Sequence, residues 1–368
     1  MGGGTGGHFY PLIAIAEAVR ERDAQYGAES ELFYLGPEPY NHTALDSVGM
    51  RYVYCPAGKQ RVYRSLLNFF DKFKIVTGLF VAFFQLLRLY PDAVMSKGGY
   101  TSVPVVLAAW LLRIPIVIHE SDAVPGRANM LAARFASYIG VAYAEVSSVF
   151  PAGKVALVGM PIRRAFLRDV ADPYSALGIP KDRPVLLITG GSSGASRLND
   201  FVLRSLNQLL INYTVLHQTG DAHADRVTTD ASALFSDRSQ LDHYFVFGHL
   251  DQDQFVAALQ ASSLVISRGG STTLFELSLK GKPAIIIPIP EEVSRDQRSN
   301  AYAYARKTGA VVIEEHNLSD DLLVTEIDRI LGDSETARQM SVAALGFTTP
   351  DAGITLADTL RNIAREHE

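Results

Sequence analysis

Short apolar runs rich in valine and isoleucine alternate along the chain with longer stretches of helical spacing. The clearest runs cover residues 91–97, 114–120, 184–190, 263–269 and 283–289. Each run is apolar on both faces of an extended strand, which is the pattern of a parallel sheet covered by helices on both sides. The pattern therefore predicts an α/β fold in which strands and crossover helices alternate.

Two glycine-rich turns lead into predicted helices roughly half a chain apart. Their sequences are GGGTGGH at residues 2–8 and GGSSGAS at residues 190–196. Because each turn opens its own series of strands and helices, we predict two Rossmann-like domains. The N-terminal domain is expected over residues 1–160, with a helix over 350–368 packing back onto it, and the C-terminal domain over residues 161–349.

The first glycine turn has an unusual position. Such a turn normally follows a buried strand, but only Met1 precedes it. The sequence therefore predicts that the first, usually central, strand of the N-terminal sheet is missing. After the turn, Pro11 suits the first turn of a helix. The buried stripe of that helix is expected at Leu12, Ile15, Ala16 and Val19.

Composition narrows the class of protein. The 34 basic and 39 acidic side chains leave a net charge of −5, and 48% of the residues are apolar, as in ordinary globular proteins. No nucleic-acid partner is predicted. The single cysteine, Cys55, allows neither an internal disulfide nor a cysteine-based metal site, and the absence of a secretory leader favours the cytoplasm. The uncharged apolar run at 75–87 is shorter than the ~20 residues that span a bilayer.

A third glycine turn offers phosphate chemistry. In SRGGSTTLFE, two glycines free the backbone, and residues 271–273 begin a helix whose amides can hold a diphosphate. Glu276 follows on the same helix, where a carboxylate can accept both hydroxyls of a ribose. An alternative explains the glutamate about as well: a carboxylate near the positive N-terminal end of a helix is stabilised by the helix dipole.

Polar residues also follow two predicted strands, at the edge where open α/β sheets bind ligands. After residues 114–118 come His119, interpreted as a hydrogen-bonded core residue, and Glu120, interpreted as functional. After residues 283–289 come Asp296, Gln297 and Asn300, which suit a hydroxyl-rich ligand or a solvated helix cap.

Asp251 and Asp253 resemble an acidic motif that holds a metal diphosphate. Helical spacing follows them directly, so we interpret them as an acidic helix start and predict no metal site. Motifs for zinc hydrolysis or serine nucleophiles are not found in the sequence.

Taken together, these stretches resemble the family 28 glycosyltransferases from Gly2 to about Arg361. Those enzymes move N-acetylglucosamine from UDP onto undecaprenyl-diphospho-muramoyl-pentapeptide in peptidoglycan synthesis. The matching pieces, in order, are GGTGGHFYP, GKQRVYRSLLNFFDKFKIV, KGGYTSVPVVLAA, HESDAVPGRAN, VGMPIR, TGGSSGASRLN, SRGGSTTLFE and DQRSNA. The resemblance implies the two-domain glycosyltransferase-B fold with an active-site cleft, inverting transfer at the cytoplasmic face of the membrane, and no cofactor beyond the UDP-sugar substrate.

The resemblance also implies site residues. The acceptor side comprises Thr5, Gly6, Gly7, His8, Tyr100, Glu120 and Asn129. The donor side comprises Arg163, Ser192, Asn199, Arg268, Ser271, Thr272, Thr273, Glu276, Gln297 and Asn300. His8 is the candidate general base because an unperturbed imidazole titrates near neutrality, Glu120 is its rival, and Tyr100 is a further catalytic candidate.

The chain departs from the family pattern at Asp122, at Met160 and at residues 269–271. Asp122 matters most, because at a substrate-binding position an anion repels the diphosphates unless it is protonated or paired.

An anionic membrane surface is a further expected partner, through residues 62–89. Aromatic and basic residues interleave up to Lys74, and this half is the predicted contact. For the half after Ile75, a helix buried against the sheet is as good an interpretation as a membrane contact.

Other functions fit the same fold. One is a transferase that makes a different glycolipid, and another is a UDP-sugar epimerase, which needs acid and base groups on both faces of one sugar. The third is a nucleotide-binding protein without activity.

Overall fold

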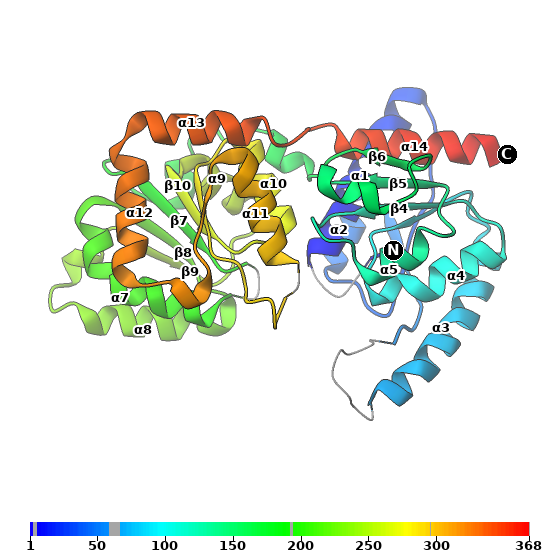
Figure 1. Ribbon diagram of the computed structural model, residues 1–368, viewed down its shortest axis with the longest axis horizontal. Coiled ribbons are helices and arrows are strands. Elements are labelled where there is room, and N and C mark those ends of the chain that lie inside the picture. Colours follow the sequence, from blue (N-terminus) through cyan, green and yellow to red (C-terminus); the bar gives the residue numbers. More distant parts are fainter. Residues whose placement is uncertain (3–5, 59–66, 192–193, 295, 368) are drawn as a thin grey trace. The chain divides into compact units, whose positions relative to one another are not determined.

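The computed structural model describes residues 1–2, 6–58, 67–191, 194–294 and 296–367, with only the backbone for 67–73 and 367. The chain divides into two compact units (Figure 1). The first comprises Met1–Arg164 with Thr349–Glu368, and the second comprises Ala165–Thr348. The expected boundaries after residues 160 and 349 lie within a few residues of these.

The first unit contains, in chain order, α1 (Gly6–Tyr26), β1 (Leu32–Gly36), α2 (His42–Ser47), β2 (Met50–Tyr54), α3 (Leu67–Leu89), β3 (Val94–Ser96), α4 (Val103–Leu111), β4 (Ile116–Glu120), α5 (Arg127–Ala132), β5 (Tyr138–Val141), β6 (Val155–Leu157) and α14 (Ala352–His367). Its described strands form two parallel sheets, β1-β2 and β3-β4-β5-β6. Helices α1 and α14 pack on one face of the larger sheet, while α3, α4 and α5 pack on the other.

Helix α1 begins earlier than the sequence predicts. It starts at Gly6, so Pro11 lies in its second turn, and the prediction of a first-turn proline is wrong. Proline has no N–H to donate to the carbonyl of Gly7, one turn earlier. The predicted stripe of this helix is confirmed as buried, at Leu12, Ile15, Ala16 and Val19.

Helix α14 returns the C-terminal end of the chain to α1. Arg22 of α1 forms a two-pronged ion pair with Asp358, at 2.7 Å for each nitrogen–oxygen contact. Arg361 of α14 lies 2.9 Å from the buried carboxylate of Asp23. Between these pairs, the apolar side of α14 contacts α1 and β4, so the helix belongs to the first unit.

The second unit contains α6 (Pro173–Leu177), β7 (Val185–Thr189), α7 (Ser196–Asn212), β8 (Thr214–Gln218), α8 (Ala224–Leu234), β9 (Tyr244–Phe247), α9 (Gln252–Ala261), β10 (Leu264–Ser267), α10 (Ser271–Leu279), β11 (Ala284–Ile286), α11 (Gln297–Thr308), β12 (Val311–Val312), α12 (Asp320–Gly332) and α13 (Ser334–Leu345). Its described strands form one parallel sheet in the order β12-β11-β10-β7-β8-β9. Helices α7 and α8 lie on one side and α9 and α10 on the other (Figure 1). The predicted α/β class is confirmed, because all five apolar runs contain a strand of a parallel sheet.

Candidate active site

Polar side chains gather where β3 and β4 end. Lys97 follows β3, and its buried Nζ lies 2.5 Å from His119 Nδ1 and 2.7 Å from Ser121 Oγ. On the other side of the ring, His119 Nε2 lies 2.8 Å from the carbonyl oxygen of Gly159. Because both ring nitrogens have protein partners, the prediction that His119 is a hydrogen-bonded core residue is confirmed.

Glu120, the last residue of β4, is only 2% exposed. Its Oε2 accepts hydrogen bonds from the Gly126 backbone N–H at 2.9 Å and from the Asn129 side-chain amide at 3.0 Å. Its Oε1 accepts a hydrogen bond from the Asp122 backbone N–H at 3.1 Å. The structure thus brings Glu120, Asp122 and Asn129 together, with the carboxylate fixing the loop between β4 and α5.

Burial shifts the protonation of this cluster. It lowers the pKa of Lys97 to about 7, although the carboxylates of Glu120 and Asp122 act in the opposite direction. Burial and then the Lys97 charge hold the pKa of His119 well below its ordinary value, so the ring is neutral at pH 7. Burial, with the nearby Asp122 charge, raises the pKa of Glu120. The charges of Glu120 and of Asp122, the residue that departs from the family pattern, favour the protonated form of Lys97.

Sequence reasoning misses Lys97. The sequence feature that could have identified it is a lysine between an apolar strand and the pair Gly98–Gly99, at the carboxyl edge of the sheet. Close packing around Lys97 explains why glycine stands at position 98. Gly98 has a φ of 81°, and a Cβ there would lie 2.8 Å from Oδ1 of Asn129. Only glycine lets α5 approach the end of β3 this closely.

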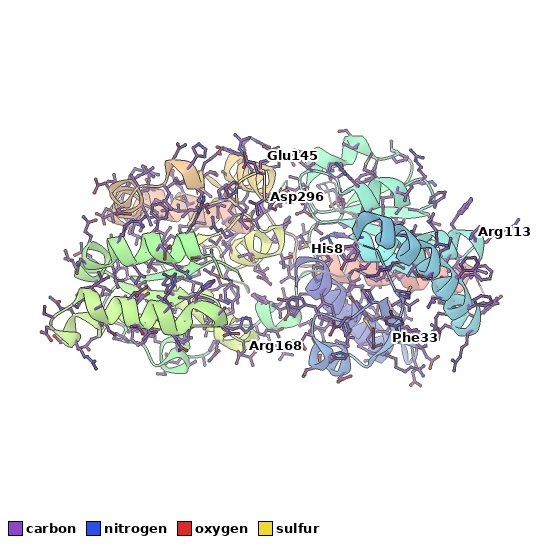
Figure 2. All side chains as sticks on the ribbon, turned by 90° about the horizontal axis from the view of Figure 1, so that it is seen from below. His8, Phe33, Arg113, Glu145, Arg168 and Asp296 are labelled. Atoms are coloured by element: carbon purple, nitrogen blue, oxygen red, sulfur yellow. The ribbon has the colours of Figure 1, made fainter. Side chains whose placement is uncertain are left out.

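The remaining acceptor-side candidates lie in two short segments. Gly6, Gly7 and His8 form the first turn of α1, where His8 is half-buried (Figure 2). Tyr100, also half-buried, opens the short 3-10 helix Tyr100–Ser102 directly after Gly99. Thr5 lies outside the described residues, as does Ser192 on the donor side.

Arg163 is placed in the first unit, whereas the resemblance assigns it to the donor side. Its guanidinium lies over the ring of Tyr10, 4.2 Å from the centroid, beside the first turns of α1. A cation held against an aromatic face keeps its charge and its outward N–H groups. The position of Arg163 therefore adds a positive charge next to the segment that contains His8.

In the second unit, Asn199 is a structural residue. Its side-chain amide donates to the carbonyl of Thr219 at 3.0 Å, and its Oδ1 lies 3.1 Å from His217 Nε2. The side chain is fully buried. Gly194 has a φ of 73°, and a Cβ there would collide with the same Thr219 carbonyl. Asn199 thus fixes the start of α7 against the end of β8.

Helices α10 and α11 begin side by side. The carbonyl of Gln297 lies so close to Gly269 that any Cβ at position 269 would collide with it. Asn300 donates to the carbonyl of Gly269 at 3.4 Å, which ties α11 to the turn before α10. The predicted helix start at residues 271–273 is confirmed, with Gly270 as its N-cap.

Several donor-side candidates line these two helix starts. Glu276 lies in the second turn of α10 and is 5% exposed. The others are the buried Ser271, the half-buried Thr272 and Thr273 of α10, the N-cap Asp296, and Gln297 at the start of α11. The structure therefore gathers carboxylate, hydroxyl and amide groups around backbone amides at the carboxyl edge of the sheet.

Arg268 forms a buried ion pair. Its Nη2 lies 2.6 Å from Oε2 of Glu315, and its Nη1 donates to the carbonyl of Ile287 at 3.1 Å. The other Glu315 oxygen lies 2.9 Å from Arg197 of α7. Sequence reasoning misses Glu315, because nothing in its local sequence distinguishes it from an exposed carboxylate. This pairing holds the Arg268 guanidinium between Glu315 and the carbonyl of Ile287.

The prediction that Asp251 begins a helix is confirmed. Asp251 is the N-cap of α9, and its carboxylate accepts the Gln254 backbone N–H at 2.8 Å while the Gln254 side chain accepts the Asp251 N–H at 3.1 Å. This reciprocal capping accounts for the acidic residue without a metal. In the part of the chain that the structure describes, no group of three or more histidine, cysteine, aspartate or glutamate side chains could hold a metal ion.

Family models match both units. One described as the glycosyltransferase family 28 N-terminal domain matches residues 1–141, and one described as the glycosyltransferase family 28 C-terminal domain matches residues 185–354. The chain is 32% identical to the UDP-N-acetylglucosamine–N-acetylmuramyl-(pentapeptide) pyrophosphoryl-undecaprenol N-acetylglucosamine transferase of Treponema denticola, over 98% of this chain and 96% of that protein.

Solved structures agree with these models. The crystal structure of Acinetobacter baumannii MurG matches with a TM-score of 0.73 and 25% identity, covering 98% of each chain. A UDP-GlcNAc 2-epimerase from Neisseria meningitidis, solved with UDP-GlcNAc, matches with a TM-score of 0.67 and 14% identity, covering 96% of this chain and 97% of its own. At that identity the second match shows the shared fold alone.

Proposed function

The chain belongs to glycosyltransferase family 28, and on this basis we propose that it transfers N-acetylglucosamine from UDP-N-acetylglucosamine to undecaprenyl-diphospho-N-acetylmuramoyl-pentapeptide. The observation that carries the proposal is the similarity to the Treponema denticola transferase over nearly the full length of both proteins. It covers both units, so it includes the acceptor-side and donor-side segments. Peptidoglycan synthesis, and with it cell shape and division, is the process that this reaction serves.

The chemistry assigns a task to each side of the reaction. An acceptor hydroxyl attacks the anomeric carbon, a base takes the hydroxyl proton, and the bond to the diphosphate breaks with its electron pair leaving on UDP. Attack opposite the leaving group inverts the anomeric configuration. The protein must therefore supply a base on the acceptor side and stabilise the anionic leaving group on the donor side.

We propose His8 as the base. The hydrogen bonding of Glu120 supports this choice, because both of its oxygens accept hydrogen bonds from the loop that follows β4. A carboxylate held in this way serves as a positioning group for the acceptor loop. His8 lies in the first turn of α1, and histidine is the side chain most often used as a general base.

On the donor side, we propose that the start of α10 holds the diphosphate. Backbone N–H groups at a helix start are directed at an anion and are favoured by the helix dipole. Gly270 and Ser271 are the residues at that start, and Arg268 is the nearest arginine in sequence. Because Arg268 is paired with Glu315, these amides are the main groups proposed to stabilise UDP as it leaves.

Glu276 is proposed to bind the ribose of the donor. Glu276→Ala is expected to weaken UDP binding by roughly 1.5–3 kcal/mol, because a charged acceptor loses two hydroxyl hydrogen bonds. Titration calorimetry with UDP measures this. Glu292→Ala, which removes an exposed carboxylate of the same unit, is the matched control and should bind UDP normally. Equal UDP affinity of the folded Glu276 variant and the parent protein would contradict the assignment.

Acceptor-dependent UDP release tests the proposed function. The parent protein is expected to release UDP from UDP-N-acetylglucosamine only when a short-chain analogue of the lipid acceptor is present. Sugar epimerisation without acceptor would favour the epimerase alternative. UDP binding without any turnover would favour the inactive nucleotide-binding alternative. Turnover with an unrelated glycolipid, but not with this acceptor, would favour a different transferase.

A membrane contact is also proposed, at the cytoplasmic face. Among the described residues, no helix is long and apolar enough to cross a membrane. Helix α3 buries one side at Gly78, Ala82 and Leu86. It exposes an opposite apolar stripe, which we define as Val76, Phe80, Phe84 and Leu87, with exposed fractions of 52%, 61%, 63% and 52%.

The residues of this stripe lie in the half after Ile75, whose sequence fits a buried helix about as well as a membrane contact. The predicted half is Val62 to Lys74, and its side chains up to residue 73 lie outside those described, so that part of the contact stays a prediction. Lys74 and Arg88 are exposed at the two ends of the described half. Aromatic side chains flanked by basic ones suit an anionic lipid surface. Docking there would bring the enzyme to its lipid-linked acceptor.

The α3 stripe can be tested with anionic vesicles. Replacing Phe80 and Phe84 by serine should reduce the vesicle-bound fraction several-fold, because each loses apolar area that would enter the lipid interface. Flotation with phosphatidylglycerol vesicles measures this fraction. Ile211→Ser removes an equally exposed apolar residue from the second unit and should leave binding unchanged. Unchanged flotation of the folded double variant places the contact elsewhere.

A further inference from the structure

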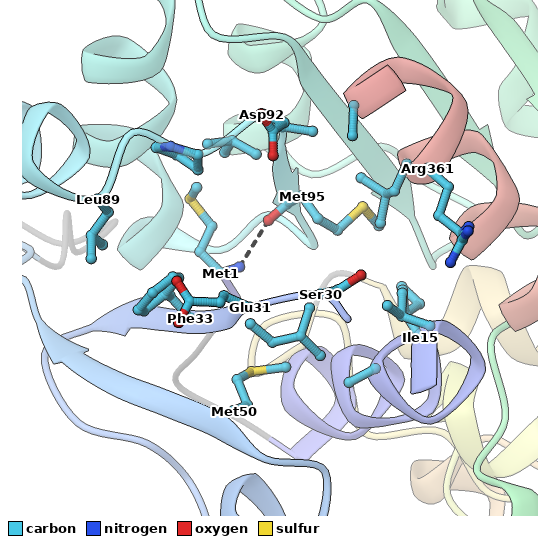
Figure 3. Close-up of a pocket in the computed structure, with 18 of the residues that line it drawn as sticks. Met1, Ile15, Ser30, Glu31, Phe33, Met50, Leu89, Asp92, Met95 and Arg361 are labelled. Atoms are coloured by element: carbon cyan, nitrogen blue, oxygen red, sulfur yellow. Dashed lines mark hydrogen bonds between the residues drawn. The ribbon is translucent and has the colours of Figure 1, made fainter. Parts of the chain in front are cut away.

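Lys97 is a buried cation that takes no part in the mechanism described so far. Its side chain is 1% exposed, and it follows β3 at the carboxyl edge of the sheet. Val94 and Met95, which come shortly before it in β3, line a cavity of about 520 Å³ in the first unit (Figure 3). Their side chains are apolar, so the strand gives the ammonium no counter-charge. A lysine is almost never buried this completely unless it is paired.

The hydrogen bonds of Lys97 link the ends of three strands. His119 Nε2 lies 2.8 Å from the carbonyl oxygen of Gly159, which can only accept, so this nitrogen carries the proton of the neutral ring. Nδ1 is therefore an acceptor, and Lys97 Nζ donates to it at 2.5 Å. Nζ also lies 2.7 Å from Ser121 Oγ. Because Lys97 follows β3, His119 lies in β4 and Gly159 follows β6, these bonds fix the start of the loop after β4 against its neighbours.

Two carboxylates belong to the same loop. Glu120 and Asp122 flank Ser121, and the charge of each raises the pKa of Lys97, against the burial that lowers this pKa to about 7. Glu120 is buried, whereas Asp122 is half-buried and more accessible. The charge of Asp122 also raises the pKa of Glu120. The loop thus carries two anions that repel each other and has one buried cation behind it.

This arrangement of charges matters for an anionic ligand at the acceptor side. A carboxylate repels a diphosphate and a cation attracts it, and both effects are stronger in a poorly hydrated site than in water. We propose that Lys97 is a positioning residue for the diphosphate of the acceptor. It fixes the loop after β4 through Ser121, and its charge balances that of Asp122, so that the loop can take an anion. The proposal rests on the proposed function, which supplies the diphosphate-linked acceptor.

A double-mutant cycle in the full chain tests the charge balance. Lys97→Met keeps the length of the side chain and removes its charge, so it is expected to raise the KM for a short-chain lipid acceptor at least about tenfold. Adding Asp122→Asn should bring this KM back to within about threefold of the parent value, because it removes the anion that Lys97 balances. Asp122→Asn alone should not raise the acceptor KM. In all three variants, the KM for UDP-N-acetylglucosamine should change by less than about twofold.

Lys154→Met is the matched control. Lys154 is an exposed lysine of the same unit, placed before β6 at the opposite edge of the sheet, and its Nζ donates to the carbonyl of Ala136 at 2.8 Å. Its replacement also removes one charge and one hydrogen bond, but far along the strand from the loop after β4. The acceptor KM of this variant should equal that of the parent protein.

An unchanged acceptor KM in Lys97→Met, or a double variant no better than Lys97→Met, would overturn the proposal. Equal losses toward acceptor and donor would also overturn it, because they would indicate a merely structural role. Turnover by the parent protein in the same assay supports the proposed function whatever the variants do. A parent protein that neither turns over nor binds the acceptor by calorimetry would overturn both proposals, and binding without turnover lets the same cycle be measured as affinities. If Lys97→Met does not fold, Lys97→Gln, which keeps an N–H donor for His119, replaces it in the cycle.

Discussion

Replacing His8 by alanine is expected to lower the rate of sugar transfer by about 10² to 10⁴, the usual cost of losing a general base. The affinity for UDP should change little, because His8 lies in the first unit, whereas the donor-side residues other than Arg163 lie in the second. Initial rates at saturating UDP-N-acetylglucosamine, together with UDP calorimetry, separate the two quantities. A fall in rate without a fall in UDP affinity is the expected signature.

The matched control is His42→Ala, which removes an exposed histidine of the same unit. It should transfer sugar at the parent rate. Glu120→Gln distinguishes the two candidate bases, because it keeps the size and one acceptor oxygen of the side chain. If Glu120→Gln reduces the rate more than His8→Ala while the protein stays folded, the roles of the two residues must be exchanged.

Glu315→Ala is expected to lower the free energy of unfolding of the second unit by about 3–5 kcal/mol. The substitution leaves the Arg268 guanidinium buried without its carboxylate, at a site where the two side chains are 8% and 5% exposed. Removing one partner of a buried ion pair costs more than the pair contributes, because the remaining charge stays desolvated. Urea unfolding followed by circular dichroism measures the change.

Asp320→Ala is the control for that measurement. Its ion pair with Arg204 spans 3.2 Å between side chains that are 37% and 50% exposed. Pairs of this kind contribute about 0–1 kcal/mol, because water screens both charges. Equal destabilisation by the two substitutions would contradict a special role for the Arg268–Glu315 pair.

Most of the fold follows from local pattern. The five apolar runs each contain a strand, because a short run rich in apolar side chains is stable in a sheet that helices cover on both faces. The buried stripe of α1 could also be predicted, since the spacing of its apolar residues matches one helical face. The first residue of α1 could not be predicted, because glycine favours turns and the helix nevertheless begins at Gly6.

The residues of the candidate site could be predicted from the sequence only in part. Glu120 and Asn129 lie nine positions apart in one segment, and the structure joins them at 3.0 Å. Lys97 and Glu315 were missed, because a charged residue is buried only when distant parts of the chain supply its partners. For Lys97 those partners come from β4 and the residues after it, and for Glu315 they are Arg197 and Arg268.

For helix α3, the sequence does not predict which face is buried. Its sequence from residue 75 is apolar on every side, so no periodicity separates a buried face from an exposed one. Contact with α4 and the close approach of the Pro56 carbonyl to Gly78 decide which side is buried. The exposed Phe80 and Phe84 follow from that packing.

The central claim is inverting transfer of N-acetylglucosamine to a lipid-linked muramoyl-pentapeptide. Its most direct test is the structure of the product formed from UDP-N-acetylglucosamine and a short-chain acceptor, determined by mass spectrometry and proton NMR. The account predicts a lipid-linked disaccharide whose new linkage is β, opposite to the α configuration of the donor. An α linkage, or a product in which the sugar is altered but not attached to the acceptor, would contradict it.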